Sequence, residues 1–294
     1  MALLAKPGRR ALIGLLILIL SLLLLARKAF IVEPDALVVR SYAMTIPDWP
    51  PALNGFRIAA LGDIHGGAPY IDEKKLDEVA RRISAEKADL IVWLGDYVIQ
   101  GVLGGHFMEP EKVAALLSKA EAANGQIAVI GNHDRWLDAE RVEKSFEKAG
   151  VTFLLWRSKT FELKGVRLHV YGLDDYELSP GYWPTLRKTI REWKALPPGE
   201  PLIVLSHSPD VFPSLPARVT LTIAAHTHGG QVRLPGIGSP IVPSSFGQRY
   251  AGGAISENGR HLFVNTGLGT SIFPIRLGVT PEISIITISS TTPH

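Results

Sequence analysis

Side chains that bind metals recur along this chain, each time directly after an apolar run. The segments are Gly62-Asp63-Ile64-His65, Gly95-Asp96, Gly131-Asn132-His133-Asp134, Ser206-His207 and Ala225-His226-Thr227-His228. They hold five of the nine histidines, a concentration that scattered surface histidines would not produce. In Asp-x-His and His-x-His, residues two apart on an extended segment point the same way. Each pair therefore presents two ligands to one site.

The ligand types indicate which ions such a site takes. Imidazole and carboxylate groups suit Mn, Fe, Zn or Ni, whereas the absence of sulfur disfavours copper(I) and structural zinc. The chain contains no cysteine, which also excludes disulfides, iron–sulfur clusters and a thiol nucleophile. We therefore expect two divalent metal ions per chain, with one carboxylate able to bridge them.

The elements that must position these ligands alternate between strand and helix, and strands dominate the second half. Strands are predicted at residues 56–61, 90–94, 127–130, 166–171, 202–205, 221–225, 262–264 and 283–288. Helices are predicted at 72–87, 110–124, 138–150 and 184–196. Ligands at the carboxyl ends of neighbouring strands meet in one crevice of an open α/β sheet. The pattern predicts an α/β sandwich with mixed sheets.

The N-terminus predicts a membrane anchor. Residues 11–26, ALIGLLILILSLLLLA, contain no charge. As a helix they span about 24 Å, slightly less than the roughly 30 Å hydrocarbon core, and the flanking Arg10, Arg27 and Lys28 can snorkel. We expect a signal anchor in residues 1–28, a linker and edge segment in 29–54, and one globular domain in 55–290. A cleaved signal peptide, or a twin-arginine signal at Arg9-Arg10, is the alternative.

The charge balance separates the anchor from the body. Five of the 31 Lys and Arg residues lie in residues 1–28, which hold no Asp or Glu, so the rest carries a formal charge of −2. Such a body lacks the basic footprint of a nucleic-acid-binding protein. The charges that flank the apolar run lean only slightly to a cytoplasmic N-terminus and an external body, which leaves the membrane face of the body open.

The ordered ligand set resembles the calcineurin-like metallophosphoesterase superfamily over roughly residues 55–290. The segments His226-Thr227-His228-Gly229-Gly230-Gln231 and Asn265-Thr266-Gly267-Leu268-Gly269-Thr270 look like a branch of membrane-anchored bacterial phosphoesterases, some of them UDP-2,3-diacylglucosamine pyrophosphatases of lipid A synthesis. The resemblance implies a sandwich of two mixed β-sheets flanked by helices. It also implies a single-pass protein of the bacterial inner membrane.

The resemblance assigns roles to individual residues. Asp63, His65 and His228 would hold the first metal, and Asn132, His207 and His226 the second. Asp96 would bridge both ions. His133 would bind no metal and would act on the phosphate as an acid or transition-state donor. Two ions about 3.5–4 Å apart activate water at neutral pH and clamp phosphoryl oxygens, so the expected reaction is hydrolysis of a phosphoric ester or anhydride.

Two positions depart from the family pattern. Ala225 stands where the family usually has Gly, which is a small change. Ile99-Gln100 stands where the protein Ser/Thr phosphatases of the superfamily have Asp-Arg. The missing Asp-Arg pair argues against a phosphoprotein phosphatase. It also leaves His133 without the Asp that orients the catalytic histidine in those phosphatases.

Other polar residues carry weaker signals for substrate binding. Arg233, Arg249 and Arg276 follow the His-x-His pair and are candidates for a phosphate or nucleotide contact, with ordinary solvation as the alternative. His106 lies in a glycine-rich loop after Asp96 and is a further candidate. Residues 234–246 are apolar and rich in proline, and form either a packed loop or a lipid-facing lip beside the site.

Three hypotheses about function remain. The first is a membrane-anchored phosphoesterase of a lipid-linked substrate such as UDP-2,3-diacylglucosamine, or of general phosphodiesters and monoesters in the envelope. The second is an inactive metal-binding membrane scaffold, against which the complete ligand set speaks. The third is a nuclease, against which the anchor and the charge of the body speak. The expected partners are therefore the bilayer and a phosphorylated lipid rather than a nucleic acid.

Overall fold

The computed structural model describes residues 8–290; the first seven residues, with Lys6 of the expected anchor, lie outside it. The helices are α1 (Arg9–Arg27), α2 (Glu33–Asp35), α3 (Glu73–Ala85), α4 (Pro110–Leu117), α5 (Asn132–Lys148) and α6 (Tyr182–Trp193). The strands are β1 (Val38–Thr45), β2 (Phe56–Leu61), β3 (Leu90–Trp93), β4 (Gln126–Ala128), β5 (Thr152–Phe153), β6 (Arg157–Leu163), β7 (Val166–Gly172), β8 (Leu202–Leu205), β9 (Leu221–Ala224), β10 (Gly253–Glu257), β11 (Arg260–Val264) and β12 (Glu282–Ser289).

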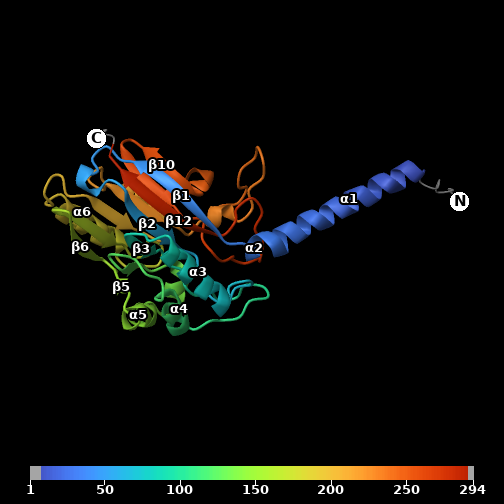
Figure 1. Cartoon of the computed structure of the whole chain (residues 1–294), viewed down its shortest axis with the longest axis horizontal. Coiled ribbons are helices and arrows are strands. Elements are labelled where there is room, and N and C mark those ends of the chain that lie inside the picture. Colours follow the sequence, from blue (N-terminus) through green and yellow to red (C-terminus); the bar gives the residue numbers. More distant parts are fainter. Residues whose placement is uncertain (1–7, 291–294) are drawn as a thin grey trace.

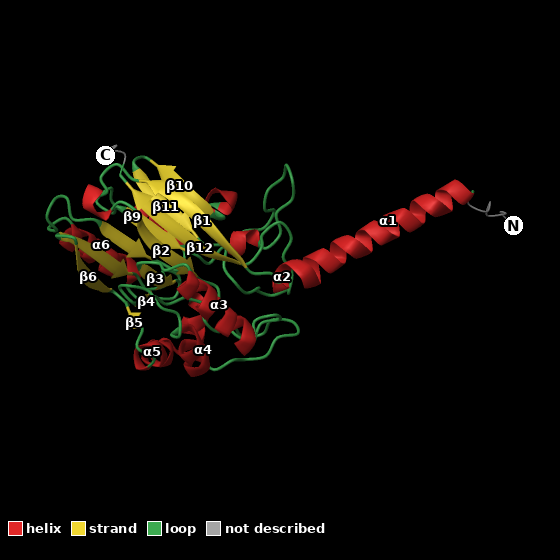
Figure 2. Cartoon of the chain, in the orientation of Figure 1, coloured by secondary structure: helices red, strands yellow, loops and turns green. Residues whose placement is uncertain are grey.

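Two six-stranded sheets form the body, which confirms the predicted α/β sandwich of mixed sheets. Their strand orders are β1-β12-β2-β3-β4-β5 and β10-β11-β9-β8-β7-β6. Strands β2 to β5 run parallel in the first sheet, and β7, β8, β9 and β11 in the second, while β12 and the edge strands β6 and β10 pair antiparallel with a neighbour. The helices lie outside the paired sheets (Figure 2).

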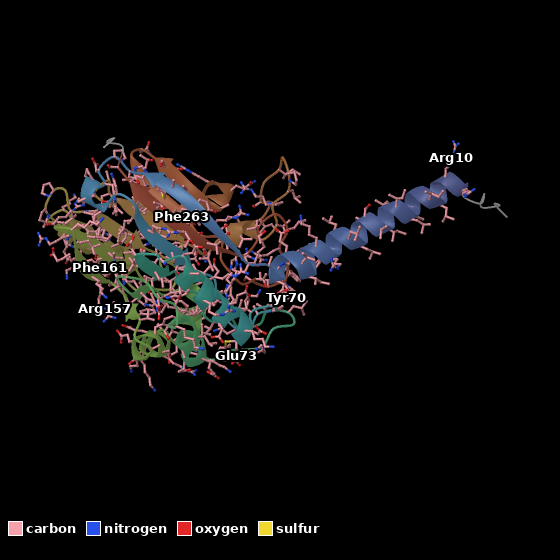
Figure 3. All side chains as sticks on the ribbon, viewed as in Figure 1. Arg10, Tyr70, Glu73, Arg157, Phe161 and Phe263 are labelled. Atoms are coloured by element: carbon pink, nitrogen blue, oxygen red, sulfur yellow. The ribbon has the colours of Figure 1, made fainter. Side chains whose placement is uncertain are left out.

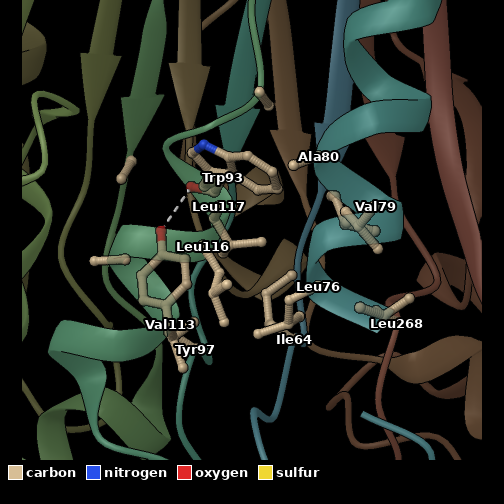
Figure 4. Packing of buried hydrophobic residues seen from close by; sticks show 14 of the residues in the cluster. Ile64, Leu76, Val79, Ala80, Trp93, Tyr97, Val113, Leu116, Leu117 and Leu268 are labelled. Atoms are coloured by element: carbon tan, nitrogen blue, oxygen red, sulfur yellow. Dashed lines mark hydrogen bonds between the residues drawn. The ribbon is translucent and has the colours of Figure 1, made fainter. Parts of the chain in front are cut away.

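Three apolar layers hold these elements together. The layer between the sheets includes Ile58 and Val92 of the first sheet and Ile203 and Ile223 of the second, all fully buried. A second layer lies under α3 to α5, where Leu76, Val79, Trp93 and Val113 pack together (Figure 4). A third lies under α6. Strands β3, β8 and β9 are buried along their whole length, and Thr222 is their one polar residue, as expected for parallel strands covered on both faces.

Helix α1 projects from the body (Figure 1) and has no buried residue. It continues through a π-helical segment, Lys28–Val32, into α2. At this junction the amide of Arg276 donates to Ala29 O at 2.9 Å and Tyr70 Oη to Phe30 O at 2.7 Å. The helix is therefore attached to the body at its C-terminal end, close to Tyr70 in Figure 3.

Helix α4 is shorter than predicted, ending at Leu117 rather than near residue 124. The side-chain amide of Gln126 donates to Ser118 O and Ala120 O, so these carbonyls bond outside a helix. Strands β1, β5, β6 and β10 had no strand prediction of their own, and all four are edge strands. Strand β5 has only two residues. The other three have half-exposed side chains, and their mixed composition hides the apolar run that marked the central strands.

Candidate metal centre and active site

The ligand segments all begin just beyond the carboxyl ends of parallel strands. Asp63 and His65 follow β2, Asp96 follows β3, Asn132 follows β4, His207 follows β8, and His226 and His228 follow β9. The first three strands belong to one sheet and the last two to the other. Because the sheets face each other, the two sets of ligands meet. Every ligand is buried except His226, which is half-buried.

Asp63, His65 and His228 form the first group, with their ligand atoms within 4.8 Å of one another. The two imidazoles face each other with 3.1 Å between their Nε2 atoms. Each Nδ1 lies near a backbone carbonyl, Val98 O at 3.4 Å and Gly269 O at 3.3 Å. If both Nδ1 atoms donate there, both Nε2 atoms present lone pairs to the same point.

This arrangement fits a cation. Burial lowers the pKa of His65 to about 3 and that of His228 well below its ordinary value, so neither ring protonates to relieve the facing lone pairs. The carboxylate of Asp63 adds a buried oxygen, Oδ2, that has no hydrogen-bond partner. Two lone pairs and an unpartnered carboxylate oxygen in a buried space form a donor set that a divalent ion satisfies.

Asp96, His207 and His226 form the second group, and Asn132 joins it. The Nδ1 atom of His207 lies 2.7 Å from Leu94 O and donates to it, so that Nε2 points toward the site. There Nε2 is 3.1 Å from Asn132 Oδ1, 3.2 Å from Asp96 Oδ2 and 3.1 Å from His226 Nδ1. Four potential donor atoms thus converge at a second point.

The carboxylates decide where protons reside when no metal is bound. Burial acts to lower the pKa of His207, but Asp96 and Asp63 outweigh it and raise the pKa to about 10. Burial also raises the pKa of Asp63 to about 7. For Asp96 burial acts upward, but His207 and neighbouring histidines hold its pKa well below the usual range. A metal would therefore replace the proton on His207.

Asp96 lies between the two groups. Its Oδ2 atom is 3.8 Å from His65 Nε2 on one side and 3.2 Å from His207 Nε2 on the other. Its Oδ1 atom accepts from the amide of His133 at 2.9 Å. This position matches the bridging role that the family resemblance implies for it.

Backbone strain concentrates at these ligands. Asp63, His65, Asp96, His226 and His228 all have φ between 48° and 71°, a left-handed conformation that is uncommon outside glycine. Strained residues of this kind persist where the surrounding structure holds them for function.

Close approach of the backbone also requires glycine at this site. A Cβ atom on Gly131 would lie 2.2 Å from Asp96 Oδ1, and one on Gly267 2.6 Å from the Cβ of Asp63. These two glycines therefore leave the space in which the carboxylates sit.

Asp134 has a positioning role that the sequence analysis did not assign. Its buried carboxylate accepts from the amides of Asp96 at 2.8 Å, Tyr97 at 2.9 Å and Gly131 at 3.0 Å. It thus ties the loop after β3 to the loop after β4. The signal was present, because Asp134 belongs to the Gly-Asn-His-Asp segment.

Asn265 performs a similar task across the sheets. Its Oδ1 accepts from the amides of Gly62 and Gly267, and its Nδ2 donates to Ser284 Oγ at 2.8 Å. It therefore fixes the turn that leads into Asp63.

His133 lies at the N-terminal end of α5 and lines the cleft above the centre. The Asp that would orient it is absent, and Gln100 stands beside it instead. The Nδ1 atom of His133 is 3.3 Å from Gln100 Oε1, and the amide of Gln100 donates back to His133 O at 3.3 Å. Gln100 thus replaces a carboxylate orienter with a neutral one. Burial lowers the pKa of His133. His133 also groups spatially with His65 and Asp96, so it is within reach of a metal.

The four weaker substrate candidates lie outside the cleft. The guanidinium of Arg276 is fully buried and donates to the carbonyls of Thr266, Gly269 and Val279, so it stabilises the loop instead of contacting a phosphate. The remaining three are Arg249, ion-paired with Glu257; Arg233, in a separate depression; and His106, in the loop after Asp96.

The cleft over the metal centre is open and mixed in character, with a volume of about 290 Å³. Its floor includes Asp96, His226 and His228. Its walls include the apolar side chains of Trp136, Ile241, Pro243 and Ile272, together with Gln231 and Ser271. None of the described residues that line it is a Lys or an Arg.

Comparisons with known proteins place the chain in a family. Residues 56–230 match the model for calcineurin-like phosphoesterases. A metallophosphoesterase of Bacillus subtilis, YkuE, is 31% identical over 88% of this chain and 88% of its own length. The phosphodiesterase YaeI of Escherichia coli is 28% identical over 79% of this chain and 81% of its own. A zebrafish (Danio rerio) transmembrane protein with a metallophosphoesterase domain is 26% identical over 81% of this chain and 54% of its own.

The chain belongs to the calcineurin-like phosphoesterase family and is a metal-dependent phosphoesterase. Its Asp and His clusters are able to bind metal ions.

Proposed function

We propose that this member of the calcineurin-like phosphoesterase family is anchored in the bacterial inner membrane and hydrolyses a phosphodiester or pyrophosphate bond in a lipid-linked substrate. The observation that carries the proposal is the position of the cleft. Its floor includes metal-binding side chains, and its walls include the apolar side chains of Trp136, Ile241 and Ile272. Its rim segment 271–276 contacts Ala29, in the segment that continues the apolar helix α1 into the body.

In this proposal the chain holds two divalent ions. Asp63, His65 and His228 would hold the first, Asn132, His207 and His226 would hold the second, and Asp96 would contribute to both. When bound, the ions supply Lewis-acid stabilisation of the phosphoryl oxygens and an activated water. Gln100 orients His133 through Nδ1, which leaves Nε2 to exchange a proton with the leaving oxygen.

The lining of the cleft supports a substrate with little charge beyond the reacting phosphate. Because no Lys or Arg in residues 8–290 lines it, a phosphate outside the reach of the metals meets no cationic partner from this part of the chain. Trp136, Ile241 and Ile272 offer apolar contact for a lipid substituent. UDP-2,3-diacylglucosamine satisfies the apolar requirement but carries two phosphates. A lipid phosphodiester with a single charge satisfies both the apolar requirement and the requirement for little charge. Activity on phosphodiesters in general is the second candidate function.

Helix α1 supports the anchoring. Its large apolar side chains from Leu12 to Leu25 are 44–62% exposed in the described structure, and they cover every face of the helix. A helix that is apolar all round belongs in protein or lipid, and α1 has no buried residue in the body. The bilayer is the proposed partner of this surface.

A substrate screen tests the proposal. The purified full-length protein, loaded with Mn²⁺, is assayed against UDP-2,3-diacylglucosamine, a phosphatidic acid p-nitrophenyl ester and bis-p-nitrophenyl phosphate, with Asp96→Asn as the inactive control. We expect both lipid-linked compounds or one of them to be preferred in kcat/KM. Preference for the soluble diester would instead identify a general phosphodiesterase, and no turnover of any compound would support the inactive scaffold.

The membrane face needs a separate measurement. A reporter fused after the last residue shows on which side the body lies. A nucleotide-linked lipid precursor requires a cytoplasmic body, so an external reading would eliminate UDP-2,3-diacylglucosamine and leave an envelope phosphodiesterase.

A further inference from the structure

Exposed apolar side chains concentrate in three loops around the mouth of the cleft. The loops are residues 100–108, 231–246 and 270–278. Six side chains in them, here called the apolar collar, are 41–80% exposed: Leu103, Phe107, Ile237, Ile241, Ile272 and Phe273. Soluble proteins rarely leave so many large apolar side chains together in water, and such patches mark interaction sites.

The three loops are connected to one another. The amide of Leu103 lies 3.4 Å from Ile272 O. Gln231 and Ser271 exchange two hydrogen bonds, from Gln231 Nε2 to Ser271 O and from the amide of Ser271 to Gln231 Oε1. The amide of Arg233 donates to Leu277 O at 2.7 Å. The collar is therefore one surface rather than three separate tips.

The same loops meet the end of the anchor. The amide of Arg276 donates to Ala29 O at the junction of α1 with the body. Buried beneath it, the Arg276 guanidinium binds the carbonyls of Thr266 and Gly269. In Figure 1 the loops extend from the body on the side from which α1 projects. If α1 crosses a bilayer, the collar faces that bilayer at the level of its surface.

The charges of the loops fit a lipid surface. None of the three loops contains an Asp or a Glu, although the chain has 28 of them. They carry only Arg233 and the buried Arg276 as fixed charges, and Arg27 and Lys28 lie where α1 reaches the body. An acid-free apolar surface beside basic residues matches the interface of an anionic membrane.

We propose that the apolar collar inserts into the headgroup region of the bilayer and seats the mouth of the cleft on the membrane. This inference rests on the anchoring in the proposed function and adds a second, interfacial contact to it. Ile241 and Ile272 belong both to the collar and to the cleft wall. A lipid phosphate at headgroup depth therefore reaches the metal centre while its acyl chains stay in the bilayer.

Site-directed spin labelling of the full-length protein tests this directly, because the native chain has no cysteine. Ile237→Cys and Phe273→Cys are labelled with a nitroxide and reconstituted into phosphatidylethanolamine–phosphatidylglycerol nanodiscs. Ser158→Cys is the matched control, an exposed position on the edge strand β6. We expect the two collar labels to collide more with oxygen than with a nickel chelate, and the control label to show the reverse.

Two results overturn the inference. Collar labels that are as accessible to the nickel chelate as the label at 158 mean that the collar stays in water. Collar labels that are shielded from both quenchers and broadened by spin–spin coupling between copies mean that a second protein chain covers it.

A kinetic arm separates this inference from the proposed function. The variant Leu103→Ser/Ile237→Ser/Phe273→Ser changes collar side chains that do not line the cleft. We expect its rate on a vesicle-embedded phosphatidic acid p-nitrophenyl ester to fall about tenfold, since interfacial binding scales with buried apolar area. We expect its rate on bis-p-nitrophenyl phosphate to stay unchanged.

If wild-type protein cleaves no lipid while the collar labels are immersed in the bilayer, the substrate proposal fails and the collar proposal stands. If lipid cleavage persists unchanged in the variant, the collar fails and the substrate proposal stands.

Discussion

The floor of the cleft and its rim are built by opposite means. The floor consists of polar side chains, nearly all buried, that follow the ends of parallel strands and are held by backbone hydrogen bonds. The rim consists of apolar side chains that stand exposed on loops without helix or strand. Each region inverts the usual distribution, since polar groups prefer water and large apolar groups prefer the core.

This difference implies that the floor carries out the reaction and that the rim selects the substrate. A buried set of carboxylates and imidazoles is stable only when cations or protons compensate it, so the floor is committed to metal binding. The exposed side chains of the rim make few contacts with the rest of the body, so they can be exchanged without loss of the fold. The rim is therefore free to vary with the substrate. Changes in the floor should therefore abolish all turnover, and changes in the rim should alter only which substrates are cleaved.

The largest expected effect comes from Asp96→Asn in the floor. The substitution removes the charge between the two metal positions, and we expect metal content and turnover of every substrate to fall, turnover by more than about 10³-fold because metal ions supply several kcal/mol of transition-state stabilisation. Elemental analysis and a soluble diester assay measure both. Asp72→Asn is the control, because Asn caps α3 as well as Asp does. Wild-type protein that is active with fewer than about one metal per chain would contradict the dinuclear centre.

His133→Ala tests whether a residue of the cleft can be lost without loss of metal. We expect full metal content and a fall in kcat of about 10²–10⁴-fold, the usual contribution of a general acid or base. His106→Ala, at an exposed loop histidine outside the cleft, should leave the soluble diester rate unchanged. Loss of metal from His133→Ala would make His133 a ligand, which its proximity to His65 and Asp96 permits.

The sequence predicted the floor better than the rim for a physical reason. Asp96 and His207 each follow a short, wholly apolar strand, and Asp63 follows a strand in which only Arg57 is polar. Such runs are visible without a structure. Gln100 was missed as the orienter of His133 because the two are 33 positions apart and meet only through the fold. Arg276 was offered as a phosphate ligand because its type suggests it, whereas its burial depends on carbonyls of a loop that no periodicity reveals.

Gln100 permits a smaller test, at the border between floor and rim. Gln100→Ala should lower kcat about tenfold with KM unchanged, as loss of an orienting contact does. Gln100→Glu should restore orientation and place a negative charge beside His133, which raises the pKa of that imidazole from its lowered value. The limb of the rate–pH profile that reports His133 should therefore move to higher pH. A profile that is identical in wild type and Gln100→Glu would mean that Gln100 does not act through His133.

The smallest effect is expected from the anchor, which touches neither region directly. Removing residues 1–28 deletes α1 but keeps Ala29, whose carbonyl accepts from Arg276, so the rim loop and the metal ligands keep their contacts. Turnover of a soluble diester should stay nearly unchanged. Turnover of a lipid substrate in vesicles should fall only severalfold, because the anchor confines the search to the membrane, while the collar still binds the interface on its own. The ratio of the two rates, measured for both lengths of chain, separates the effect of the anchor from the effect on catalysis.

If the truncated protein retained its full lipid rate, substrate capture would belong to the rim alone and α1 would serve only localisation. If the soluble rate also collapsed, the junction at Ala29 would be part of what holds the floor in place, and the separation between the two regions would fail.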